Sequence, residues 1–83
     1  MEFRPPTRLE RTTLADGTEV STVNLQSAAM DAATQYETCV FYPTGNSNVV
    51  SRYATEAEAL AGHRFFVEHE RLHSAYSSHY YGA

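Results

Sequence analysis

The chain has 83 residues, and ten acidic residues against six basic ones give it a net charge of −4. That length allows one domain, and the negative balance argues against binding that depends on neutralising the phosphates of DNA or RNA. A single cysteine, Cys39, excludes an internal disulfide. We find neither a signal-peptide pattern nor an apolar run near the ~20 residues that a membrane helix needs, so we expect a cytoplasmic protein without membrane contact.

The first third of the chain predicts an arm and a β-hairpin. Residues 1–7 have no periodicity, which indicates an N-terminal arm. We expect a weak strand over 8–14 and a second strand, rich in β-branched residues, over 19–25. Asp16 and Gly17 between them are a strong hairpin signal, because glycine tolerates the positive φ of such turns.

The middle of the chain predicts a second strand pair after a linker. Residues 26–35 are small and polar, and we interpret them as a loop or as one or two loose helical turns. Residues 36–42 alternate between two sets of side chains with the period of a strand that has two distinct faces. Turn-forming residues at 43–47 then lead into a partner strand over 48–53.

A helix is predicted over 55–73. Thr55 and Glu58 have the spacing of a capping box, and an acidic first turn suits the helix dipole. At 100° per residue, a set of apolar side chains falls on about half of the helix surface, and we expect this stripe to pack on the sheet. The stripe consists of Ala57, Leu60, Ala61, Phe65, Val67, Leu72 and Ala75.

These elements predict one α+β domain over 1–83, in which an antiparallel sheet of about four strands (8–53) carries one C-terminal amphipathic helix. So short a chain buries only about 60% of its unfolded surface, and we therefore expect a homo-oligomer. Phe66 points away from the apolar stripe, and residues 74–83 form a tyrosine-rich tail. The expected interface consists of Phe66, Tyr76, Tyr80 and Tyr81, with a solvated tail as the alternative.

One stretch matches an enzyme motif. His69-Glu70-Arg71-Leu72-His73 fits H-E-x-x-H, in which two histidines on one helix face bind zinc and the glutamate activates water; His79 stands where the longer motif has its third ligand. Tyr76 replaces the glycine that the longer motif needs for its turn. We therefore expect no enzyme activity, no cofactor and no metal site, and interpret His69, His73 and His79 as residues of a solvated helix face.

A binding site for an anionic, ring-bearing molecule is predicted where the last strand meets the helix. Arg52 and Tyr53 precede the helix N-terminus, so that a guanidinium, an aromatic ring and backbone donors stand close together. Tyr36 and Phe41 are the further candidates for stacking on a base. The alternative is that Arg52 pairs with Glu37 across the sheet.

Three further residues are ambiguous. A glycine within a helix costs roughly 1 kcal/mol relative to alanine, so Gly62 indicates close approach by a ligand or another backbone, or else a tight contact between helix and sheet. His63 and Arg64 are second-choice ligand-binding residues. Cys39 has no neighbouring cue for a lowered pKa, and we expect an inert, packed thiol.

Three blocks of this sequence resemble, in order, a group of short tailed-bacteriophage proteins that are mostly of unassigned function. The blocks are Asp16-Gly17-x-x-Val20-Ser21-Thr22-Val23, Tyr36-Glu37-Thr38-x-Val40-Phe41 and Arg52-Tyr53-x-Thr55-x-x-Glu58-Ala59-x-x-Gly62-His63. The resemblance spans residues 16–67. It departs at 24–27, where those proteins commonly carry a Leu-Gly-Leu-Asp-His-type stretch. The size and plan also resemble the phage sponge proteins that sequester cyclic nucleotide signals of Thoeris-type immunity, which are small multimers with pockets between subunits.

The resemblance implies a non-enzymatic phage anti-defence protein in the host cytoplasm. It would oligomerise and evade immunity by sequestering a small nucleotide-type signal, so its partner would be a cyclic nucleotide-type molecule. Three alternatives stay open. The first is an inhibitor or adaptor that binds a host defence or replication protein through Phe66 and the tail. The others are a small virion component and, last, a zinc-dependent hydrolase.

Overall fold

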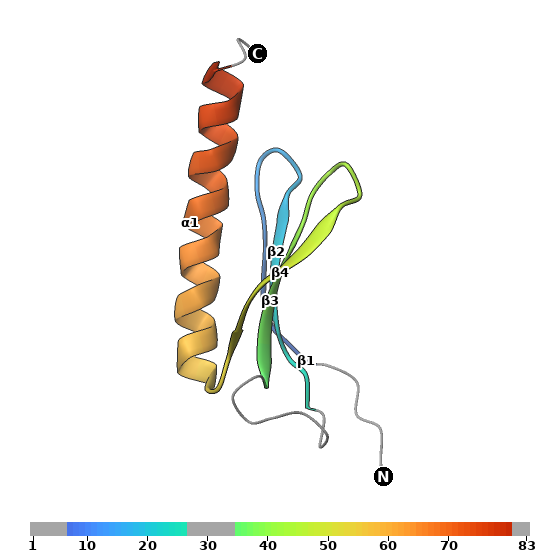
Figure 1. The fold of residues 1–83 in the computed structure, drawn as a ribbon, viewed down its shortest axis with the longest axis vertical. Coiled ribbons are helices and arrows are strands. Elements are labelled where there is room, and N and C mark those ends of the chain that lie inside the picture. Colours follow the sequence, from blue (N-terminus) through green and yellow to red (C-terminus); the bar gives the residue numbers. More distant parts are fainter. Residues whose placement is uncertain (1–6, 27–34, 81–83) are drawn as a thin grey trace.

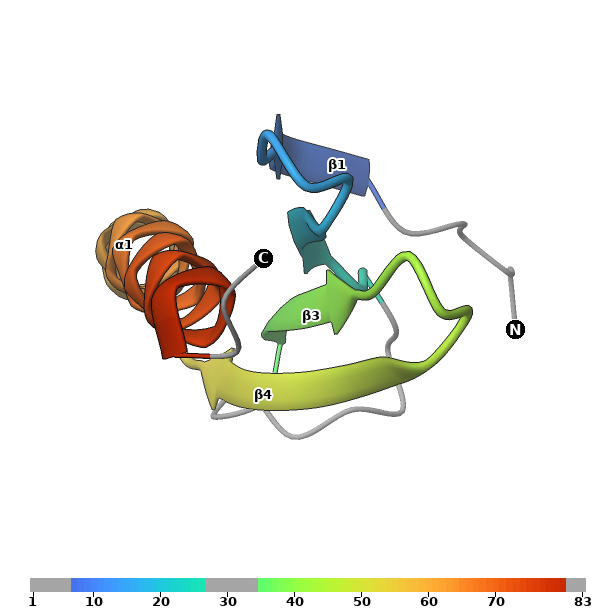
Figure 2. The same cartoon turned by 90° about the horizontal axis from the view of Figure 1, so that it is seen from above.

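A computed structural model of the protein describes residues 7–26 and 35–80, with side chains as far as His73. Its elements are β1 (Thr7–Thr13), β2 (Glu19–Asn24), β3 (Tyr36–Phe41), β4 (Ser47–Tyr53) and α1 (Glu56–Tyr80). The strands form one antiparallel sheet in the order β1-β2-β3-β4. The helix α1 lies against one side of this twisted sheet (Figures 1 and 2). The predicted α+β fold is therefore confirmed.

Two hairpin turns connect the strand pairs at one end of the sheet, and each uses a glycine with positive φ. Gly17 has a φ of 94° and Gly45 a φ of 96°. In the first turn, the Thr18 backbone N–H donates to Asp16 Oδ1 over 2.8 Å, which closes the loop that the Asp-Gly pair predicts. The second turn is closed by the Tyr42 N–H, which donates to a backbone carbonyl four residues further along.

The register divides the paired residues between two faces, because residues directly opposite each other in neighbouring strands share a face. β-bulges at Leu9 and Val50 lie outside this pairing. The inner sheet face, toward α1, has three rows: Thr7, Asn24, Tyr36 and Tyr53; Glu10, Thr22, Thr38 and Ser51; Thr12, Val20, Val40 and Asn48. The outer sheet face has three others: Arg8, Val23, Glu37 and Arg52; Arg11, Ser21, Cys39 and Val49; Thr13, Glu19, Phe41 and Ser47.

The start of α1 confirms the predicted pairing of Thr55 with Glu58. The Glu58 N–H donates to Thr55 Oγ1 over 3.2 Å, and the Thr55 hydroxyl donates to Glu58 Oε1 over 3.0 Å. The carboxylate thus binds the capping hydroxyl itself. The predicted helix end at residue 73 is wrong, because α1 continues to Tyr80. Its last turns extend past the hairpin tips of the sheet (Figure 1).

The helix packs on the sheet through a different face from the one that the apolar stripe predicted. Among the helix residues with described side chains, Ala59, His63 and Glu70 are buried, whereas Phe65 and Leu72 are each 62% exposed. Ala57 and Ala61 are exposed too, Leu60 and Val67 are half-buried, and the Ala75 side chain lies outside the described residues. Ala59 and Gly62 are small, and His63 forms hydrogen bonds to the sheet, so this face of α1 can lie close to the strands. The face with Phe65 and Leu72 is more apolar but bulkier.

Phe66 lies away from the apolar stripe, as predicted, and its place in an interface stays a prediction. Phe66 is half-buried, at a spacing that places it with Ala59, His63 and Glu70 on the buried side of α1. Its neighbour Phe65 is the exposed aromatic residue, and the two rings meet edge to face with centroids 5.0 Å apart. Tyr76, Tyr80 and Tyr81, the other predicted interface residues, have side chains outside the described part of the chain.

The interior of the described domain contains few apolar side chains. Only Leu14, Val20, Val40 and Ala59 are buried hydrophobic residues there. Six polar or charged residues are buried with them: Thr18, Ser21, Thr22, Thr38, His63 and Glu70. Every buried side-chain nitrogen or oxygen in the described part has a hydrogen-bond partner. Since an unpaired buried polar group costs about 1–3 kcal/mol, this fold depends on those partners as well as on apolar burial.

Candidate functional site

The outer sheet face has a local excess of positive charge in a chain with a net charge of −4. The row formed by Arg8, Val23, Glu37 and Arg52 has an arginine on each edge strand, and Arg11 lies in the next row. The face therefore holds three of the six basic residues, while its paired positions include two acids, Glu19 and Glu37 (3 − 2 = +1). The strand register places Arg8 and Arg11 on the same face of the sheet as Arg52, and sequence reasoning missed both.

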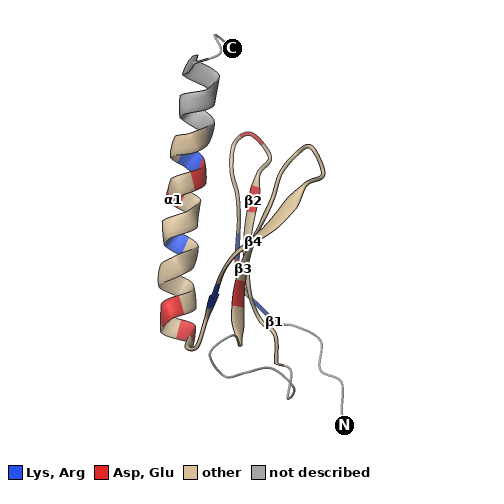
Figure 3. Cartoon of the chain, in the orientation of Figure 1, with Lys and Arg blue, Asp and Glu red and all other residues tan. Residues whose placement is uncertain are grey.

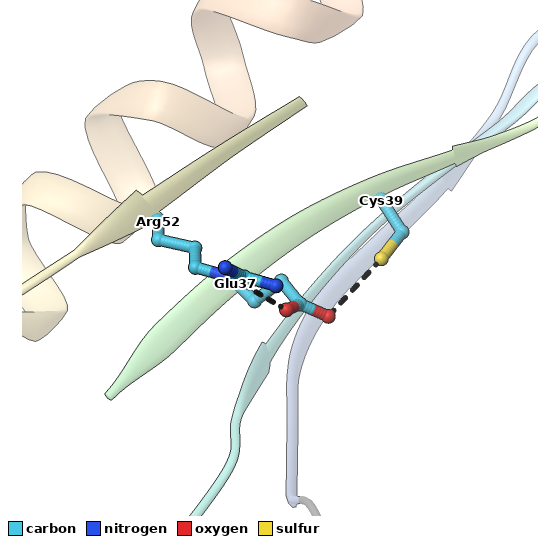
Figure 4. A network of polar contacts seen from close by, with 3 residues as sticks. All are labelled: Glu37, Cys39 and Arg52. Carbon is cyan, nitrogen blue, oxygen red and sulfur yellow. Dashed lines mark hydrogen bonds and ion pairs between the residues drawn. The ribbon is translucent and has the colours of Figure 1, made fainter. Parts of the chain in front are cut away.

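Arg52 forms the predicted alternative contact, an ion pair with Glu37. Arg52 Nε donates to Glu37 Oε2 over 3.1 Å, and the Arg52 side chain is 51% exposed. The Cys39 thiol donates to Glu37 Oε1 over 3.3 Å, so one carboxylate serves both groups (Figure 4). The Glu37 side chain is only 15% exposed, so an anion that binds Arg52 would have to compete with a partly buried carboxylate.

The surroundings of the Cys39 thiol disfavour its reactive thiolate form. Burial, followed by the hydrogen bond and negative charge of Glu37, raises its pKa to about 11, and the Arg52 charge offsets this only in part. Because the thiolate is the reactive form, the thiol stays protonated and unreactive at neutral pH. This agrees with the inert, packed thiol that the sequence predicts.

The predicted aromatic residues are divided between the two faces of the sheet. Phe41 lies on the outer sheet face, 44% exposed, and is four residues along β3 from Glu37, a distance of ~13 Å. Tyr36 and Tyr53 are paired with each other on the inner sheet face. The predicted cluster of Arg52, Tyr53, Tyr36 and Phe41 is therefore not a single site, and of the four only Arg52 and Phe41 lie on the outer sheet face.

Tyr53 is instead part of the contact between helix and sheet. A Cβ built on Gly62 would lie 2.5 Å from Cε1 of the Tyr53 ring and closer still to Cζ and Oη. Of the alternatives that the sequence left open for Gly62, the structure shows a tight helix–sheet contact. The Tyr53 hydroxyl donates to Thr38 Oγ1 over 3.2 Å and so enters the interior.

A chain of five buried or half-buried polar side chains, which we call the His63 chain, crosses the interior. Thr38 Oγ1 lies 2.6 Å from Thr22 Oγ1, which lies 2.8 Å from His63 Nδ1, and His63 Nε2 lies 2.9 Å from Thr12 Oγ1. Tyr53 donates to Thr38, and when Thr38 donates to Thr22 and Thr22 donates to Nδ1, the Nε2–H is left to donate to Thr12. This arrangement requires a neutral imidazole.

His63 is therefore a structural residue of the interior. It is 1% exposed, and both of its ring nitrogens are engaged. Burial lowers its pKa below the usual range; the Glu10 carboxylate opposes this shift and the Arg64 charge adds to it. The second-choice ligand residues are thus separated, with His63 inside the domain and Arg64 exposed on the helix surface.

The H-E-x-x-H residues are divided between the interior and the surface. Glu70 is 7% exposed, and the pKa of Tyr42 is raised by burial and then by the charge of Glu70 and a hydrogen bond with it. His69 and His73 are exposed, and the His69 ring stacks on Phe65 with centroids 6.1 Å apart. Within the described residues, no three His, Cys, Asp or Glu side chains gather to hold a metal, and the His79 side chain lies outside them.

Comparisons with known proteins identify no similar protein. No family model matches the chain. No curated protein and no solved structure matches it at a significant level either. In the described residues, no helix is both long and apolar enough to cross a membrane.

Proposed function

We propose that this protein is a non-enzymatic phage anti-defence protein that oligomerises in the host cytoplasm and sequesters a small nucleotide-type immune signal. The resemblance of residues 16–67 to tailed-phage proteins supplies the biological setting. The observation that carries the chemistry is the outer sheet face, where Arg8, Arg11 and Arg52 lie with two acids. Arg11 pairs with Glu19 over 3.9 Å and Arg52 with Glu37 over 3.1 Å, so the face keeps a small positive excess on an acidic protein. Local charge of this kind attracts an anion whatever the net charge of the chain.

The spacing of these arginines suits a ligand with more than one anionic group. Arg8 and Arg52 are three strand spacings apart, which is ~14 Å between their backbones. Both are exposed, and Val23 and Glu37 lie between them. Guanidinium groups bind phosphate with paired hydrogen bonds, so a phosphate placed over this row would replace Glu37 as the partner of Arg52.

Equilibrium titration of the protein with a panel of cyclic mono- and dinucleotides tests this proposal. A charge-assisted hydrogen bond contributes about 1.5–3 kcal/mol, so Arg52→Ala should weaken binding about 10- to 100-fold. Arg71→Ala is the matched control, because Arg71 also forms an exposed ion pair, with Glu68 over 2.8 Å, but lies on α1. Binding that is lost equally in both variants, or in neither, would remove the outer sheet face from the site.

A further inference from the structure

Both edge strands of the sheet contain a β-bulge, and each bulge changes which side chains face outward. In a regular strand, residues three positions apart lie on opposite faces. The bulge in β1 instead places Arg8 and Arg11 together on the outer sheet face, and the bulge in β4 does the same for Val49 and Arg52. Figure 3 shows basic residues on both of these strands. The outer sheet face therefore combines side chains that regular strands would divide between two faces.

Bulges of this kind redirect side chains next to functional sites. At the edge of a sheet they also discourage pairing with another sheet, a role that does not depend on which side chains turn outward. Here the outward set is chemically distinctive. It holds every arginine of the four strands, together with Val49, one of the four large hydrophobic residues that are exposed in the described part of the chain. This combination favours a binding surface for a ligand with both anionic and apolar parts.

An exposed apolar pair lies beside Arg52. Phe41 is 44% exposed and Val49 is 50% exposed. Ser47 is directly opposite Phe41, so Val49, two residues further along β4, is its diagonal neighbour at roughly 7–8 Å. The row that contains Val49 lies between the rows that contain Phe41 and Arg52, at steps of ~7 Å. The valine therefore lies between the aromatic residue and the arginine.

A second arginine lies on the other side of Phe41. Glu19 is directly opposite Phe41 in β2, and its Oε1 lies 3.9 Å from Arg11 Nη1. Because Glu19 and Glu37 leave this face only a small positive excess, contacts with arginine alone give little affinity for a phosphate. A ligand that also covers the apolar pair gains the burial of two exposed hydrophobic side chains.

We propose that Phe41 and Val49 form the subsite for the base of the bound nucleotide, with its phosphate toward Arg52. An aromatic ring stacks on the flat face of any base, and a guanidinium binds phosphate with paired hydrogen bonds. The apolar pair and the guanidinium lie on one surface, so one nucleotide can contact both. This inference rests on the proposed function and specifies it, because the ligand must then carry a base as well as a phosphate.

A tryptophan at position 41 tests this placement, because the chain has no tryptophan of its own. A base stacked on an indole ring quenches its fluorescence. The emission of Phe41→Trp should therefore fall with at least one member of a panel of cyclic AMP, cyclic GMP, cyclic di-AMP and cyclic di-GMP. It should stay constant with inorganic pyrophosphate, which has no base. Phe65→Trp is the matched control, since Phe65 is also exposed but lies on α1, and its emission should not change.

Isothermal titration with the same panel measures the contribution of the aromatic ring. Phe41→Ala should weaken nucleotide binding about tenfold or more, whereas Phe41→Trp, which keeps an aromatic face, should bind within about threefold of the wild type. Suppose that binding depends on Arg52 but changes less than about twofold in Phe41→Ala, with constant emission from Phe41→Trp. That result would overturn this inference and leave the proposed function intact. A wild-type protein that binds none of the four nucleotides at about 100 µM would contradict both.

Discussion

Replacing Gly62 by alanine tests how closely α1 lies on the sheet. In an open helix position, alanine would stabilise the protein by about 1 kcal/mol relative to glycine. Here the new methyl group would meet the Tyr53 ring, and overpacking costs about 1–3 kcal/mol. Displacing the ring also breaks the hydrogen bond from Tyr53 to Thr38, worth about 0.5–1.5 kcal/mol. Gly62→Ala should therefore lower the free energy of unfolding by about 0.5–3.5 kcal/mol.

A double-mutant cycle makes this prediction independent of the starting stability. In a Tyr53→Ala background the ring is gone, and adding Gly62→Ala should raise the free energy of unfolding by about 1 kcal/mol through helix propensity alone. Urea unfolding followed by circular dichroism, at one fixed protein concentration, measures all four proteins. The reasoning would be refuted if Gly62→Ala stabilised the protein with Tyr53 in place, because the helix would then have room that the structure denies it.

Three further predictions concern the polar groups. Thr22→Val should lower the free energy of unfolding by about 1–3 kcal/mol in urea, with Thr22→Ser less affected, because valine removes a partner of both His63 and Thr38. Because the pKa of His63 is lowered in the folded protein, the unfolded chain binds a proton on this residue more readily. The free energy of unfolding should therefore fall as the pH drops below about 6.5. Unfolding at pH 7.5 and 5.5 measures this loss, which should be smaller in His63→Gln. Glu37→Gln removes the charge that neutralises Arg52 and should tighten binding of an anionic nucleotide in the same titration, whereas weaker binding would place the ligand elsewhere.

Local sequence signals predicted the elements of this fold well. The two turns follow from Asp16-Gly17 and from the turn residues at 43–47, and both contain a glycine with positive φ. The capping pair of Thr55 and Glu58 marks the start of α1 within one residue. These features depend on a few neighbouring residues, so a single sequence contains the information for them.

The face of α1 that packs on the sheet could not be predicted in this way. Apolar periodicity favoured the stripe with Phe65 and Leu72, because a histidine and a glutamate count against burial on any hydrophobicity scale. His63 is buried because its partners Thr12 and Thr22 are 51 and 41 residues away in the sequence. Hydrogen bonds over such separations become visible only when the strand register is known.

The same reason explains the outcome for the candidate site. The pairing of Arg52 with Glu37 was an open alternative in the sequence, since both residues belong to neighbouring predicted strands. The division of the aromatic residues between two faces depends on register, and a shift of one residue would reverse it. The grouping of Arg8 and Arg11 with Arg52 on the outer sheet face therefore became visible only in the structure.

Native mass spectrometry of the purified protein, with and without a panel of cyclic nucleotides and with a chelator-treated control, tests the central claim most directly. The proposed function predicts a discrete oligomer that gains a nucleotide mass at fixed stoichiometry. It also predicts that Arg52→Ala keeps the oligomer and loses the added mass. An oligomer that takes up no nucleotide at about 100 µM would contradict the claim of signal sequestration. A zinc mass that disappears on chelation would also contradict the proposed function, and would favour metal binding by His69 and His73 instead.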